Sequence, residues 1–88
     1  MTSGEDTDVW NNATVILYGE LVREANGLKV KQCHFIKGKI ENPGSIVIQD
    51  MTGTYDKGWQ TIALRKSGDK WISTEPQYKL DVLYNALQ

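Results

Sequence analysis

Cysteine is almost absent from this chain, since Cys33 is the only one among 88 residues. A single cysteine cannot form an internal disulfide, so the fold has to be stabilised by its core. Histidine is equally scarce, and the one histidine, His34, directly follows Cys33. Adjacent side chains of a strand point to opposite faces, so the two residues are not expected to form a nucleophile–base pair or to bind one metal ion together.

The common catalytic motifs are also missing. The sequence has no HExxH, CxxC or GxSxG motif and no glycine-rich phosphate loop, and its carboxylates show no pairing pattern. We therefore expect no enzyme activity, no cofactor and no metal site; a small enzyme with paired carboxylates is the least favoured alternative. No apolar run is long enough to cross a bilayer, and no basic-then-apolar leader opens the chain. These features predict no membrane partner and a cytoplasmic or other intracellular location.

Charge is nearly balanced, with 10 basic and 11 acidic residues. Three of the acids, Glu5, Asp6 and Asp8, lie in a polar N-terminal stretch. We expect residues 1–9 to form a flexible polar tail and residues 10–88 a single small β-rich domain. Without the three acids the domain carries a net charge of about +2, which is far from the strongly basic balance of a dedicated nucleic-acid binder.

Four turn signals divide the chain. Asn26-Gly27 is typical of a type I′ hairpin, Asn42-Pro43-Gly44 of a type II turn, and Asp56-Lys57-Gly58 of a three-residue hairpin loop. Ser67-Gly68-Asp69 predicts a last hairpin. Four turns separate five strands, so the pattern predicts a mainly β fold: a small five-stranded antiparallel barrel or sandwich.

The C-terminal segment fits two structures. Four of its residues recur at helical spacing, while an overlapping set alternates as in a strand; the two sets are Leu80, Leu83, Tyr84 and Leu87, and Tyr78, Leu80, Val82 and Tyr84. The sequence Thr74-Glu75-Pro76-Gln77 resembles a helix-capping box with an early proline. This cap chemistry favours one short C-terminal helix.

Four lysines recur around Cys33 and Phe35, and these are Lys29, Lys31, Lys37 and Lys39. In one regular strand all six side chains would share a face, giving a basic track with an aromatic platform, as single-stranded nucleic-acid binders use. A β-bulge near Gln32 would instead turn Cys33 and Phe35 into the core beside Leu28 and Val30. We favour the bulge, and expect a buried Phe35 and lysines that contribute little to folding.

Tryptophan is frequent for so small a domain. Trp59 and Trp71 flank the last hairpin and are candidates for a cross-strand pair, while Trp10 either pins the N-terminus or anchors a partner. The combined features predict a non-catalytic binding module that acts through protein–protein contact, including self-association, as an accessory or assembly subunit or an occluding inhibitor. The alternative is an OB-like module for single-stranded nucleic acid that uses the lysine-rich strand. The candidate partner-binding residues are Trp10, Lys29, Lys31, Phe35, Lys37 and Lys39.

Overall fold

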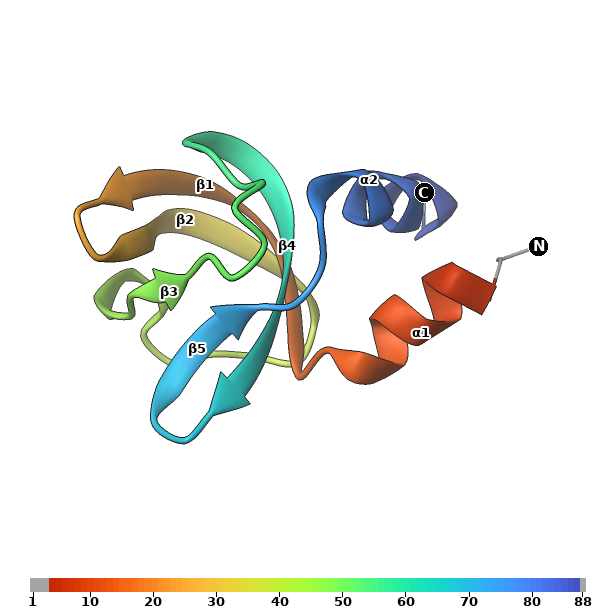
Figure 1. Cartoon of the computed structure of the whole chain (residues 1–88), viewed down its shortest axis with the longest axis horizontal. Coiled ribbons are helices and arrows are strands. Elements are labelled where there is room, and N and C mark those ends of the chain that lie inside the picture. Colours follow the sequence, from red (N-terminus) through yellow and green to blue (C-terminus); the bar gives the residue numbers. More distant parts are fainter. Residues whose placement is uncertain (1–3, 88) are drawn as a thin grey trace.

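The computed structural model describes residues 4–87, and the side chains of residues 8–86. In order along the chain, the elements are α1 (Gly4–Asn12), β1 (Val15–Glu24), β2 (Gly27–Lys37), the 3-10 turn η1 (Pro43–Ser45), β3 (Ile48–Gln49), β4 (Gly58–Ser67), β5 (Lys70–Ser73) and α2 (Gln77–Leu87) (Figure 1). The predicted mainly β domain with five strands and a C-terminal helix is confirmed.

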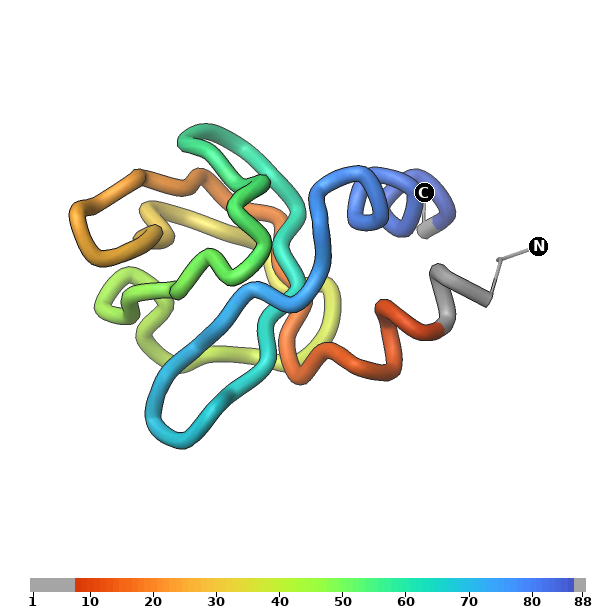
Figure 2. Tube along the Cα trace, viewed as in Figure 1, coloured from red at the N-terminus to blue at the C-terminus, as the bar shows by residue number. Residues whose placement is uncertain are grey.

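The strands pair in the order β1-β2-β3-β5-β4, and β1 also pairs with β4, which closes the sheet into a barrel. The sheet is mixed, because β3 and β5 run parallel while the other neighbours are antiparallel. The expected purely antiparallel arrangement is therefore only partly right. The difference arises after β3, where residues 50–57 cross to the start of β4 without forming a hairpin (Figure 2). The hairpin predicted at Asp56-Lys57-Gly58 is accordingly wrong.

The apolar residues of β1 lie on both of its faces, as a central or doubly covered strand requires. Leu17 pairs with Ile62 of β4 on the inner face, whereas Ile16 pairs with Ala63 on the outer face, and all four are fully buried. The helices explain the outer burial, because α1 and α2 pack against each other at one end of the barrel and α2 packs on β4 (Figure 1). Burial of these aliphatic side chains from both directions supplies the main stabilisation of the domain.

The N-terminal stretch differs from the expected tail. Gly4–Asn12 form α1, and Val9 within it belongs to the hydrophobic core with 2% of its surface exposed. Polar composition favoured a tail, but one buried valine and the neighbouring Trp10 are enough to attach this short helix to the domain. Residues 1–3 of the expected tail lie outside the described residues.

The turns occur near the predicted places with altered geometry. Glu24 pairs with Gly27, so the first hairpin turns at Ala25 and Asn26, and Gly27 opens β2 with a positive φ of 149°. Pro43 begins the 3-10 turn η1 instead of a type II turn, and Gly44 has no positive φ. The last hairpin is confirmed, because Ser67 pairs with Lys70. Gly68, which lies in the turn between them, has a positive φ of 65°.

The C-terminal helix is confirmed, but its predicted cap is wrong. The hydroxyl of Thr74 donates to the carbonyl oxygen of Ala63, 3.2 Å away, and so is not used for capping. The first helical amide, Gln77 N–H, donates instead to Oγ1 of Thr54 at 3.3 Å. A residue from the crossing segment therefore satisfies an amide that the start of a helix leaves without a partner.

Asp50 organises the segment between β3 and β4. Its Oδ1 accepts hydrogen bonds from Gly53 N–H at 2.8 Å and from the Thr52 hydroxyl at 3.0 Å. Its Oδ2 accepts from Tyr55 N–H at 3.2 Å and from the guanidinium of Arg23 at 3.3 Å. The Asp50 side chain is only 7% exposed, so a largely covered carboxylate holds a segment that has no strand partner.

Candidate binding surface

The lysine-rich strand β2 does not form one continuous basic face. Its pairing with β1 shifts register at Lys31 and again at Ile36, as expected for a bulge near Gln32. Leu28 and Val30 are buried before the first shift, and Cys33 and Phe35 pack against the core after it. The phase change thus directs the apolar residues of both halves of β2 inward.

Phe35 is half-buried and packs against the core, so the expected burial is only partly right. It pairs with Leu17 of β1 on the inner face, but β2 pairs with β3 only at Leu28, so β3 does not cover the other edge of β2 at Phe35. Cys33 is also half-buried, and burial raises the pKa of its thiol. Cys33 faces the core, whereas the neighbouring His34 is exposed on the other face of β2. This orientation agrees with the expectation that the two side chains do not form a nucleophile–base pair.

Lys37 and Trp10 make an internal contact. Lys37 Nζ donates to the carbonyl oxygens of Trp10 at 2.6 Å and Ala13 at 2.7 Å, and lies 5.6 Å from the centre of the Trp10 ring. These carbonyls lie at the C-terminal end of α1, where a cation satisfies free acceptors and interacts favourably with the helix dipole. Of the two roles expected for Trp10, the geometry fits pinning of the N-terminus.

Replacing Lys37 with methionine is expected to destabilise the domain by about 2 kcal/mol, because two charge-assisted hydrogen bonds are lost at a partly covered site. Urea unfolding, followed by tryptophan fluorescence, measures the change. Lys39→Met is the matched control, since Lys39 is exposed and should change stability by less than about 0.5 kcal/mol. Equal effects at both positions would contradict the capping role, and with it our account of why the four lysines are not equivalent.

The remaining candidate lysines are separate from that contact. Lys29 is half-buried on the outer side of β2, opposite Val22, whereas Lys31 and Lys39 are exposed. The six candidate residues therefore fall into three groups. Trp10 and Lys37 contact each other at the end of α1, and Phe35 packs against the core. The other three are the outer lysines Lys29, Lys31 and Lys39. The structure does not bring the six together on one surface.

A different group of side chains gathers on the outside of the barrel, and we call Tyr18, His34 and Trp59 the aromatic face. The ring centres of Tyr18 and Trp59 are 5.4 Å apart and those of His34 and Trp59 are 6.3 Å apart, with interplanar angles of 30° and 25°. Tyr84 of α2 stacks on Tyr18 at 5.1 Å. Trp59 remains 42% exposed. Large, nearly parallel rings thus meet at the solvent.

Strand order explains why the aromatic face forms. β1 lies between β2 and β4, so Tyr18 pairs with His34 on one side while its neighbour Glu20 pairs with Trp59 on the other. Cross-strand neighbours on one face are close enough for aromatic rings to touch directly or diagonally. The alternation of side chains along β1 and β4 indicates which residues of each strand share a face. It does not indicate which strands are neighbours, so the sequence alone does not predict the aromatic face. Trp59 and Trp71 do not form the expected cross-strand pair, since Trp71 pairs with Lys66.

Apolar surface continues along β1 from the aromatic face. Val22, two residues after Glu20, is 43% exposed. A shallow hollow of about 490 Å³ lies beside it, lined by Glu20, Leu21, Val22, Arg23, Lys57 and Gly58. Glu20 lines this hollow and also pairs with Trp59, and its carboxylate accepts a hydrogen bond from the Gln32 side chain at 3.2 Å.

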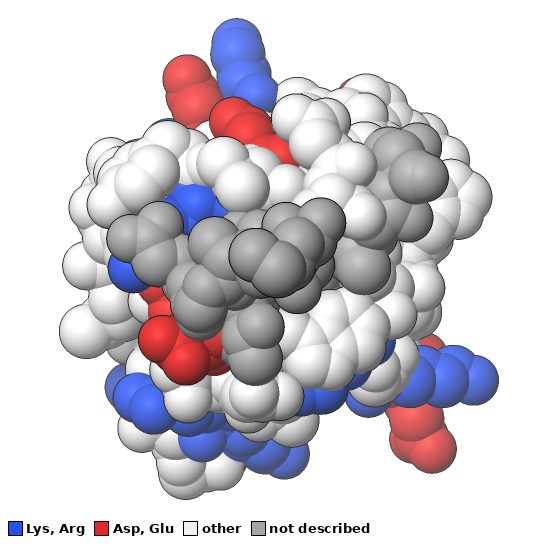
Figure 3. Space-filling view, turned by 90° about the vertical axis from the view of Figure 1, so that its right-hand side faces the viewer, with Lys and Arg blue, Asp and Glu red and all other residues white. Residues whose placement is uncertain are grey.

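Basic residues gather on the β4–β5 hairpin, away from β2. Lys66 Nζ lies 5.7 Å from the centre of the Trp71 ring. A hollow of about 250 Å³ is lined by Asn26, Val47, Gln49, Lys70 and Trp71. On the face of the molecule drawn in Figure 3, Lys and Arg side chains gather along the lower part.

Within the described residues, no three His, Cys, Asp or Glu side chains are grouped so that they could hold a metal ion. None of the helices that the structure describes is both long enough and apolar enough to cross a membrane. Comparison of the chain with protein-family models, with curated proteins and with solved structures gives no match.

Proposed function

We propose that this protein is a non-catalytic binding module that acts through protein–protein contact at the aromatic face, as an accessory or assembly subunit or an occluding inhibitor. The observation that carries the proposal is the exposure of Trp59 beside Tyr18 and His34. Tryptophan and tyrosine are enriched among the residues that dominate binding energy at protein interfaces. Their stacked rings are held by a closed barrel, so little side-chain entropy is lost when a partner covers them.

Charge favours a protein over a polyanion at this surface. Glu20 lies next to Trp59 and would repel phosphate groups. Lys37, one of the four lysines expected to form a basic track, is engaged with α1. Val22 extends the aromatic face with aliphatic surface, which suits the apolar centre of a protein interface.

The test compares Trp59→Ala with Tyr78→Ala, in which an exposed aromatic residue is removed from α2. Tagged wild-type protein is used to capture partners, each candidate partner is purified, and its affinity is measured by calorimetry; light scattering reports self-association. We expect Trp59→Ala to weaken the interaction by at least tenfold, about 1.4 kcal/mol, and Tyr78→Ala to leave it nearly unchanged. A partner that binds both variants as tightly as wild type would reject the aromatic face.

The second candidate function is binding of single-stranded nucleic acid by an OB-like barrel. The supporting observation is the closed five-strand order, together with the hollow beside Lys70 and Trp71. In OB barrels, the loops after the first and fourth strands contribute to ligand binding, and Asn26 and Lys70 adjoin the corresponding turns here.

A titration with a single-stranded oligonucleotide tests this second candidate function. Binding should weaken with salt by about −0.7 in log–log slope per phosphate, and less steeply after Lys66→Gln and Lys70→Gln. Absence of binding at low salt would reject this candidate.

A further inference from the structure

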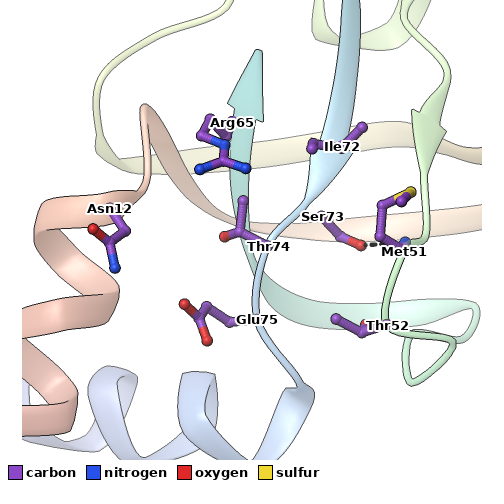
Figure 4. Close-up of a pocket in the computed structure, with 8 residues that line it drawn as sticks. All are labelled: Asn12, Met51, Thr52, Arg65, Ile72, Ser73, Thr74 and Glu75. Carbon is purple, nitrogen blue, oxygen red and sulfur yellow. Dashed lines mark hydrogen bonds between the residues drawn. The ribbon is translucent and has the colours of Figure 1, made fainter. Parts of the chain in front are cut away.

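A cavity of about 480 Å³ that is open to solvent lies between the end of α1, the β4–β5 hairpin and the segment that precedes α2 (Figure 4). Its lining residues are Asn12, Met51, Thr52, Arg65, Ile72, Ser73, Thr74 and Glu75. The volume is in the range of small-molecule sites. It is separate from the aromatic face, with which it shares no residue.

Opposite charges face each other across this cavity. Figure 4 shows the guanidinium of Arg65 extending from β4 and the carboxylate of Glu75 approaching from the opposite side, with the amide of Asn12 beside the space between them. Arg65 and Glu75 do not form an ion pair with each other. An anionic group and a cationic group of one small ligand would therefore each have a partner of opposite charge.

Glu75 has unused capacity as an acceptor. Its side chain is only 15% exposed, and its closest cation is Lys79 Nζ at 3.5 Å, longer than a strong charge-assisted hydrogen bond. Among the described residues, no hydrogen bond to the Glu75 carboxylate is formed; the Tyr55 hydroxyl donates to the backbone oxygen of Glu75 instead. A largely covered carboxylate is stabilised by further donors, which an ammonium group supplies.

We propose that this cavity binds a small zwitterionic ligand of the amino-acid class. The ligand carboxylate is held by the guanidinium of Arg65, whose two parallel N–H groups match a carboxylate. The ligand ammonium donates to Glu75, and an apolar side chain packs toward Met51 and Ile72 on the other part of the lining. The inference does not depend on the proposed protein-binding function.

The test uses leucine as the probe, with the full chain monitored by amide chemical shifts in a titration. Leucinamide lacks the carboxylate and N-acetylleucine lacks the ammonium, so each probe removes one of the two charge contacts. For wild type, we expect leucine to shift the amides around residues 72–75 and to bind at least tenfold more tightly than either derivative. Equal binding of all three probes, or no shift with leucine up to about 50 mM, would overturn the proposal.

Two variants assign the contacts. Arg65→Gln should weaken leucine binding at least tenfold while leaving leucinamide binding unchanged, and Glu75→Gln should do the same with N-acetylleucine unchanged. Lys66→Gln is the matched control, because Lys66 neighbours Arg65 on β4 but does not line the cavity. A variant that weakens all three probes equally, or a control that behaves like Arg65→Gln, would overturn the assignment of the two charges.

Discussion

Gly27→Val is expected to lower the free energy of unfolding by about 3 kcal/mol or more, from a strained backbone and a steric clash together. Gly27 has a φ of 149°, which side chains rarely permit, and a Cβ placed on it would lie 2.5 Å from the carbonyl oxygen of Ile48 and 2.9 Å from Cγ1 of Val47. The clash involves backbone next to the Leu28–Ile48 pair that joins β2 to β3. Relief would therefore require the two strands to separate. Urea unfolding monitored by circular dichroism measures the loss.

Gly68→Val separates the two causes. Gly68 also has a positive φ, 65°, but a Cβ there would meet no atom within 4 Å. The control should therefore show only the conformational cost, about 1 kcal/mol. Similar losses at the two positions would mean that the close approach of Gly27 to β3 does not contribute.

Asp50→Ala is expected to cost about 3 kcal/mol at neutral pH, because the substitution leaves the backbone amides of Gly53 and Tyr55 without their acceptor. It also removes one of the two acceptors of the Arg23 guanidinium, which donates to the carbonyl oxygen of Tyr55 as well. The effect should concentrate in residues 50–57, which have no strand partner and depend on this carboxylate. Hydrogen exchange of Gly53 and Tyr55 amides measures the local opening, and urea unfolding measures the total. Asp50→Asn, which keeps one acceptor oxygen, should lose less; a loss as large as that of alanine would assign the effect to charge.

The same carboxylate predicts a pH dependence. Partial burial raises the pKa of Asp50, but hydrogen bonds from Thr52, Gly53, Arg23 and Tyr55 outweigh burial, so its pKa lies below the ordinary value of 3.8. Its contribution to stability is therefore complete above the unfolded-state pKa and is lost as pH falls through the lower folded-state pKa. Wild type should lose more stability than Asp50→Ala between about pH 6 and pH 2. Parallel pH profiles of the two proteins would contradict this account.

Local patterns in the sequence predicted local structure well. The hairpin at Gly68, the bulge in β2 and the C-terminal helix all follow from a few neighbouring residues. The errors begin where a distant segment decides between alternatives. Thr74 is a good cap in isolation, but in the folded chain Ala63 binds its hydroxyl and Thr54 takes over the helix start.

The candidate site was less predictable for the same reason. Lys37 resembles its neighbouring lysines until α1 places two carbonyl groups beside it, 27 and 24 residues earlier in the chain. Tyr18 and Trp59 are unremarkable strand residues until β4 becomes the neighbour of β1. The sequence made Trp59 and Trp71 candidates for one cross-strand pair, but it does not distinguish Trp59, which is exposed on the outer face, from Trp71, which packs partly against the core.

The closure of β1 against β4 also sets the order in which the chain can fold. Val15 pairs with Leu64, 49 positions later, so the first strand remains unpaired along one edge until most of the polypeptide has been synthesised. Contacts so far apart in sequence carry a large loop-closure entropy, and domains rich in them fold in milliseconds to seconds. During that interval the β1–β2 hairpin presents an open edge that can pair with other chains. Refolding yield should therefore fall with increasing protein concentration, whereas the closed native barrel no longer exposes that edge.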